Sequence, residues 1–334
     1  DDSTVLVYGR SRLLQPEGYR RFLQLVAHEY LHQWNVRRLR PAELTPIDYH
    51  RPTPVPSLWF AEGVTSYFDQ FLPLAAGLSD REALLHDLGE DLSRYLLTPG
   101  RRVQSLRSSA QEAWVKLYKA DAYAADSQVS YYLKGAVVAL CLDLHLRQRQ
   151  SSLPQVLQRL WRSHGAIGRG YSEADLLAAF AQACADLATL LPAWLNGLDD
   201  PDLDGYLSCV GVKLEAAMAS SPWAGLTVAA EAGGVVAKRV WRHGPAERAG
   251  VMVGDELIAI DDRRLRTSDD LAKGLRPDVT QELLLCRRSQ LRRLSLTPLP
   301  AQVESYRLVM LESVDAQTLQ RREQWLRCIP VGAA

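Results

Sequence analysis

The chain has 334 residues, enough for two or three domains with a substantial core. Lys and Arg together number 39, as do Asp and Glu, so no overall basic character indicates a nucleic-acid partner or an anionic membrane surface. The sequence contains no apolar run of 18 residues and therefore predicts no membrane span.

Five scattered cysteines form no CxxC pair. This pattern predicts that the cysteines are small buried hydrophobic residues in a reducing compartment. It predicts neither a disulfide framework nor a second zinc site. Cytoplasm is the default location, although a truncated start would hide a signal peptide. The cysteines are Cys141, Cys184, Cys209, Cys286 and Cys328.

Apolar residues at helical spacing predict an amphipathic helix over Glu17–Asn35, and it carries the string His28-Glu-Tyr-Leu-His32. Residues four apart lie on one face of a helix, so His28 and His32 can hold one metal ion between them. Glu29 follows the first histidine and can reach a water on that metal.

A second predicted helix begins near Ser57 and carries Glu62 within Trp59-Phe-Ala-Glu-Gly63. Glu62 is the expected third protein ligand. Two imidazoles and a carboxylate, with a fourth position left to water, are typical of a catalytic zinc site with one Zn²⁺ per chain. Co²⁺ or Mn²⁺ could occupy the same ligands.

These strings carry a family resemblance. The stretch from His28 to Pro41 resembles the signature of the glycyl aminopeptidase family of zinc peptidases, and Trp59–Tyr67 resembles its second metal-ligand motif. The wider clan is thermolysin-like. Tyr131-Tyr-Leu-Lys-Gly135 resembles a Tyr-x-Lys-Gly string whose tyrosine stabilises the tetrahedral intermediate, a role that falls on Tyr132. The ordinary alternative for Tyr132 is a half-buried packing residue.

The resemblance implies a mechanism. Zinc lowers the pKa of its bound water to about 7, and Glu29 acts as the general base and later passes the proton to the leaving amine. Negative charge on the carbonyl oxygen is stabilised by zinc and by the neutral phenol of Tyr132. Asn35, Thr65 and Ser66 are candidate partners for the second nitrogens of the histidines, and ordinary surface or helix-packing roles are the equal alternative for each.

One feature of the related families is missing. They recognise the substrate amine with acidic residues, including a Gly-rich string ending in Glu upstream of the HExxH helix, and no such string stands here. The opening Asp1–Val7 resembles the segment that follows it. We therefore expect a C-terminal piece of a longer protein that lacks an amino-terminal β domain.

Apolar residues at helical spacing, together with capping boxes, predict helices over most of the region from residue 79 to about 200. Boxes are predicted at Ser79–Glu82 and Ser172–Asp175. The histidines on these helices, His86, His145 and His164, are expected to be surface or core residues rather than metal ligands.

Short strand patterns follow residue 205, and the run from Pro245 to Asp255 resembles the PDZ signature. The resemblance implies capture of an extended peptide at a sheet edge, with Gly225 and Leu226 as candidates for binding its terminal carboxylate. The alternative is a small domain that only packs against the peptidase domain and supports it.

The sequence thus predicts an α+β protein. A mostly helical thermolysin-like zinc peptidase domain (residues 1–204) precedes a small β-rich PDZ domain (205–300) and a C-terminal extension (301–334). The expected activity is an aminopeptidase acting on Gly- or Ala-type N-termini of peptide substrates. The alternatives are an endopeptidase whose PDZ domain presents peptide tails, and a non-catalytic PDZ peptide-binding adaptor.

Overall fold

The computed structural model describes residues 3–231 and 234–328, which divide into two compact units. The first comprises the chain up to Lys119, Gln128–Glu215 and the chain from Tyr306 onward. The second comprises Ala120–Ser127 and Ala216–Ser305. The second unit is thus an insertion in the first, which continues past the boundary expected after residue 204.

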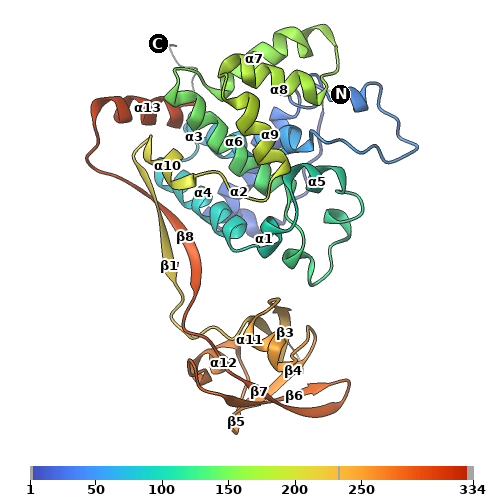
Figure 1. The fold of residues 1–334 in the computed structure, drawn as a ribbon, viewed down its shortest axis with the longest axis vertical. Helices are drawn as coiled ribbons and strands as arrows, with labels where there is room; N and C mark the ends of the chain where they lie inside the picture. Colours follow the sequence, from blue (N-terminus) through green and yellow to red (C-terminus); the bar gives the residue numbers. More distant parts are fainter. Residues whose placement is uncertain (1–2, 232–233, 329–334) are drawn as a thin grey trace. The chain divides into compact units, whose positions relative to one another are not determined.

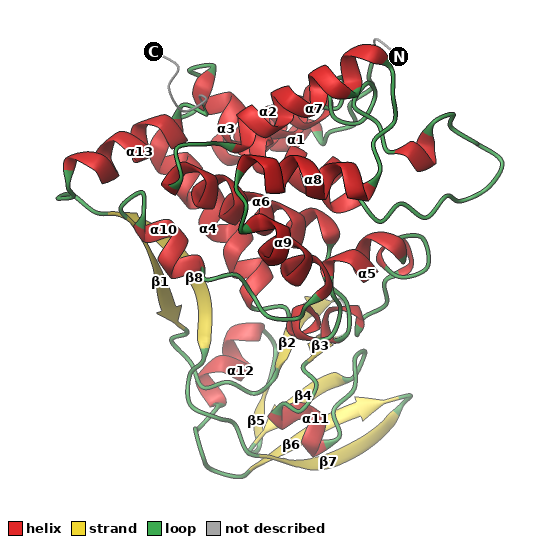
Figure 2. Cartoon of the chain, turned by 45° about the horizontal axis from the view of Figure 1, so that its top comes forward, coloured by secondary structure: helices red, strands yellow, loops and turns green. Residues whose placement is uncertain are grey.

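The first unit is built from helices (Figures 1 and 2). Its α-helices are α1 (Arg10–Leu13), α2 (Pro16–Leu31), α3 (Thr65–Ala75), α4 (Arg81–Leu96), α5 (Leu106–Gln111), α6 (Tyr131–Gln148), α7 (Leu153–Ser163), α8 (Glu173–Ala183), α9 (Leu187–Asn196), α10 (Leu203–Ser208) and α13 (Ala316–Leu326). Short turns of helix are η1 (Ala42–Leu44), η2 (Trp59–Val64), η3 (Pro99–Arg102), η4 (Leu117–Lys119) and η6 (Gly165–Ile167).

Helix α6 forms the centre of this unit, because almost all of its side chains are buried. The segment Ala124–Gln148 is apolar and long enough to cross a membrane by composition, yet 78% of its apolar window is buried inside the protein. A core helix has this property. Trp59, Phe60 and Phe71 pack into the same core from η2 and α3.

Local details of the helices depart from expectation in two places. Helix α2 ends at Leu31, so His32 is its C-cap and the predicted continuation to Asn35 is wrong. Helix α4 is capped by Asp80, whose carboxylate accepts from the N–H of Ala83 at 2.8 Å, so the predicted box at Ser79 is wrong. The box at Ser172 and Asp175 is confirmed.

The second unit is a small antiparallel sheet with two short helices. The strand order is β2-β3-β4-β6-β7, with β5 paired to β4, so β2 lies at an edge of the described sheet. Its elements are η5 (Ala124–Asp126), β2 (Leu226–Glu231), β3 (Gly234–Val240), α11 (Pro245–Ala249), β4 (Glu256–Ile260), β5 (Arg263–Arg264), α12 (Ser268–Gly274), β6 (Gln281–Arg287) and β7 (Gln290–Leu296).

The chain passes between the units along a two-stranded ladder of β1 (Val212–Met218) and β8 (Val303–Met310). After β8 the chain returns to the first unit as α13. The indole of Trp325 on α13 is fully buried and donates to the hydroxyl of Tyr67 at 3.0 Å. The region after residue 300 therefore contributes to the core of the first unit.

Two glycines let η2 and α6 touch through their backbones. A Cβ on Gly63 would lie 2.5 Å from backbone atoms of Gly135, and a Cβ on Gly135 would lie 2.9 Å from the Cα of Gly63. Real side chains do not tolerate such contacts, so one helix would have to move.

We therefore expect Gly63→Ala to destabilise the protein by about 1–3 kcal/mol through overpacking. Urea unfolding measures this change. The control is Gly9→Ala, whose Cβ would make only ordinary contact with Arg12 and should cost no more than about 0.5 kcal/mol. Equal stability of the two variants would contradict the close approach.

Candidate metal centre

Helix α2, together with its C-cap His32, carries three of the predicted site residues and is fixed by an ionic contact to α4. The carboxylate of Asp87, only 1% exposed, accepts from Arg20 at 3.0 and 3.1 Å and from Gln24 at 2.7 Å. Losing one partner of such a buried group is costly, so this contact holds the helix in place. His28, Glu29 and His32 follow along the same helix.

Glu62 comes from η2, a single π-helical segment that runs directly into α3. Wider π turns are frequent at functional sites because they re-aim a side chain. The amide of Asn35 donates to the carbonyls of Phe60 and Ala61 at 3.1 and 3.3 Å, which ties the end of α2 to this turn.

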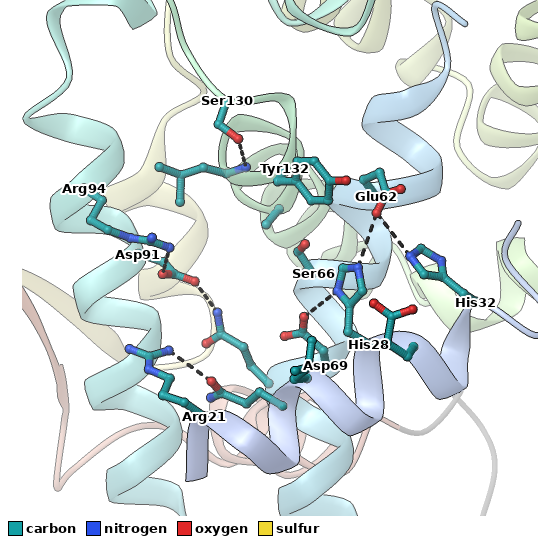
Figure 3. A pocket seen from close by; sticks show the side chains of 16 residues that line it. Arg21, His28, His32, Glu62, Ser66, Asp69, Asp91, Arg94, Ser130 and Tyr132 are labelled. Carbon is teal, nitrogen blue, oxygen red and sulfur yellow. Dashed lines mark hydrogen bonds and ion pairs between the residues drawn. The ribbon is translucent and has the colours of Figure 1, made fainter. Parts of the chain in front are cut away.

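The three expected ligand atoms converge (Figure 3). Oε2 of Glu62 lies 3.3 Å from Nε2 of His28 and 3.2 Å from Nε2 of His32. Two atoms that each lie about 2.1 Å from a tetrahedral ion are about 3.4 Å apart. The observed spacing therefore fits a zinc-sized ion, and the donor set is the one that zinc prefers.

The second nitrogen of each imidazole, Nδ1, also has a partner. Nδ1 of His28 contacts Oδ2 of Asp69 at 2.8 Å, and Nδ1 of His32 contacts the backbone carbonyl of Asn35 at 2.8 Å. These partners orient each ring with Nε2 toward Glu62. Asn35 was one of the candidate partners, and it acts through its backbone carbonyl. Asp69 was missed, and the expected Thr65 instead donates to the carbonyl of Ala61 at 2.6 Å.

The charges suit metal binding. Burial alone would lower the pKa of His28, but its contacts with Asp69 and Glu62 raise that pKa to about 9. Burial would raise the pKa of Glu62, but the two imidazoles lower it to about 2.

Tyr132 lies beside this cluster and Tyr131 does not. The ring of Tyr132 stacks on that of His28 with centroids 6.3 Å apart and lines the cavity, whereas Tyr131 is only 2% exposed. Burial and the charge of Glu62 raise the pKa of Tyr132, so its phenol stays a neutral donor. The hydroxyl of Tyr118 lies 3.3 Å from that of Tyr132.

Two cavities meet at the ligands. One of about 680 Å³ extends past Tyr132 and Asp69 toward Arg94, and one of about 370 Å³ opens beside Ser3. Both are lined by Glu29, His32 and Glu62. A chain lying across the site can therefore extend to either side of the three ligands.

Gly225 and Leu226, the candidates for peptide binding, lie where β2 begins. Gly225 has φ +73°, and a Cβ there would lie 2.8 Å from Pro245, so this turn requires glycine. The carbonyl of Gly225 accepts from the N–H of Trp241 at 2.9 Å, which fixes the loop against the end of β3. Their role in binding a carboxylate stays a prediction.

Comparison with known proteins agrees with these features. Residues 21–138 match the M61 glycyl aminopeptidase family model, and residues 236–288 match a PDZ domain model. The chain carries an M61-type peptidase domain and a PDZ domain. This confirms the family resemblance and the α+β fold. The matched M61 segment contains His28, Glu29, His32, Glu62 and Tyr132.

A solved structure is similar to nearly the whole chain. An aminopeptidase N family protein from Idiomarina loihiensis matches with a TM-score of 0.85 and 28% identity over 98% of this chain and 57% of that chain. This chain thus spans just over half of that protein.

Other solved structures match smaller parts of the chain. A serine endoprotease from Yersinia pestis matches with 27% identity over 24% of this chain and 29% of its own, at a TM-score of 0.21. The HtrA3 PDZ domain bound to a phage-derived ligand matches with 16% identity over 30% and 91%, also at 0.21. No curated protein sequence matches the chain.

The contact between Asp69 and His28 leads to a test. Asp69→Asn removes the carboxylate that orients His28, so we expect affinity of the M61 domain for zinc to fall about 10- to 100-fold. Competition with a chromogenic chelator measures this. The control is Asp199→Asn, because Asp199 is fully exposed and should leave the affinity unchanged. Unchanged affinity in Asp69→Asn would show that this contact does not orient a ligand.

Proposed function

We propose that this chain is a zinc-dependent peptidase that hydrolyses peptide bonds at one metal centre formed by His28, His32 and Glu62. The observation that carries the proposal is the convergence of two imidazole nitrogens on one carboxylate oxygen, at 3.3 and 3.2 Å, next to Glu29 and Tyr132. Zinc bound there would supply a Lewis acid and lower the pKa of a bound water to about 7.

The residues around the ligands have complementary tasks. Glu29 has no assigned ligand role and lines both cavities, so its carboxylate can take the proton of the attacking water and deliver it to the leaving amine. Tyr132 can donate a hydrogen bond to the carbonyl oxygen as negative charge develops on it. Asp69 keeps His28 oriented throughout.

We propose aminopeptidase activity on Gly- or Ala-type N-termini as the first candidate, on the basis of the M61 match. An endopeptidase of the same chemistry is the second candidate, since cavities on both sides of the ligands leave room for a longer substrate. In that case the PDZ domain would present peptide tails. A cytoplasmic location is also proposed, in keeping with five free cysteines.

The PDZ domain would bind its peptide along β2, an edge strand of the described sheet. Edge strands offer unpaired backbone groups, so a peptide can add as a further strand. Gly225 and Leu226 stand at the end where a terminal carboxylate would lie. A protein that only binds peptides, with an inactive M61 domain, is the alternative that the next experiment separates.

Glu29→Gln should abolish peptide hydrolysis while the zinc content stays near one ion per catalytic centre, because the amide cannot accept the proton and is not a ligand. Turnover is followed with peptide libraries and metal by elemental analysis, on the full-length protein. Equal turnover by wild type and Glu29→Gln would refute the catalytic assignment. In the same assay, cleavage of amino-blocked peptides would favour the endopeptidase over the aminopeptidase.

The two neighbouring tyrosines provide a matched pair. Tyr132→Phe should lower kcat about 10²- to 10³-fold, because it removes a donor to the developing oxyanion. Tyr131→Phe removes a hydroxyl that lies outside the cavity and should leave kcat close to wild type. Steady-state kinetics on both variants measure this. The reverse ranking would transfer the role to Tyr131.

A further inference from the structure

A second cluster of metal-ligand side chains lies in the first unit, apart from the M61 ligands. It joins His145 near the end of α6, Cys184 at the C-cap of α8 and Asp186 at the start of α9. One nitrogen, one sulfur and one oxygen from these residues all lie within 4.8 Å of one another. These are three of the atom types that zinc prefers.

The distances are close to those of a ligand set. Nε2 of His145 is 3.0 Å from Oδ1 of Asp186 and 3.8 Å from Sγ of Cys184, and that sulfur is 2.9 Å from the same oxygen. Around a tetrahedral zinc ion the sulfur would lie about 3.6 Å from each of the other two atoms. The nitrogen and oxygen would lie about 3.4 Å apart, so both contacts of the Asp186 oxygen must lengthen. Asp186 and Cys184 are partly exposed and can shift.

The atoms that would not bind metal already have partners. Nδ1 of His145 contacts the hydroxyl of Tyr206 at 3.0 Å, so its Nε2 faces the cluster. Oδ2 of Asp186 accepts from Arg149 at 2.8 Å, which leaves Oδ1 toward the other two residues. His28 has the same arrangement in the M61 centre, with Nδ1 on Asp69 and Nε2 on the ligand side. Such outer contacts typically accompany metal ligands.

Charge also favours a divalent ion. A thiolate from Cys184 and the carboxylate of Asp186 would together neutralise the two charges of zinc, with His145 neutral. Because His145 is only 2% exposed, its position is set by the core rather than by solvent. The site is therefore anchored on α6 and closed by the loop between α8 and α9.

We propose that His145, Cys184 and Asp186 form a second site for a thiophilic divalent cation such as zinc, with solvent as the fourth ligand. The ion would fasten the junction of α8 and α9 to the end of α6. The proposal differs from the expectation that His145 is a surface or core histidine and that the cysteines form no second zinc site. The proposal does not depend on peptidase activity.

Cobalt distinguishes this site from the M61 centre, because only a cysteine ligand produces a thiolate-to-cobalt charge-transfer absorption. The reduced, metal-free protein is titrated with Co²⁺, and bound metal is counted by elemental analysis. We expect two cobalt ions per chain and the sulfur band in wild type. Cys184→Ser should bind one ion and lose the band, whereas Glu62→Gln should weaken the other site and retain the band.

Two further variants complete the test. Cys286→Ser, in the PDZ domain, should keep both ions and the band. Asp186→Asn keeps the thiol and should lower cobalt affinity at the sulfur site at least about tenfold, which supports the assignment even if Cys184→Ser folds poorly. A wild-type chain that binds one cobalt without a sulfur band, or a band that survives in Cys184→Ser, would overturn the proposal.

Discussion

The M61 site depends on a contact between two backbones. Gly63 and Gly135 bring η2 and α6 closer than any side chain would allow. Glu62 directly precedes the first glycine, and Tyr132 lies three positions before the second. The same contact therefore places the third ligand and the phenol beside the histidines of α2. An ion of fixed radius demands such exact spacing, which two helices separated by side chains would not provide.

Hydrogen bonds and ion pairs then hold in place the residues that this backbone contact brings together. Asp87 holds α2 against α4, and Asn35 holds the end of α2 against the π turn. Asp69 and the carbonyl of Asn35 hold the two imidazole rings. His28 is thus oriented by a group from another helix and His32 by the chain directly after α2, so protein contacts hold both rings in place. Such preorganisation is what lets fixed groups act on developing charge without first rearranging.

The sequence predicted the part of the M61 site that depends on spacing between nearby residues. His28, Glu29 and His32 lie within five residues, and a helix alone sets their relative positions. Asp69 could have been predicted from the sequence, because it lies seven positions after Glu62 and therefore on the same face of the helix. This spacing was overlooked. The helix end at Leu31 and the cap at Asp80 were misjudged, since several polar residues near each end can compete for the same backbone groups.

Other features depend on tertiary structure. Trp325 was expected in a C-terminal extension, yet its indole reaches Tyr67, and only the pairing of β1 with β8 brings the chain back. His145 and Cys184 are 39 residues apart, and neither is part of a motif. The fold brings them together because the last turn of α6 lies against the C-cap of α8. Spacing in the sequence can reveal two metal ligands four residues apart, but the proposed site shared by three elements becomes visible only in three dimensions.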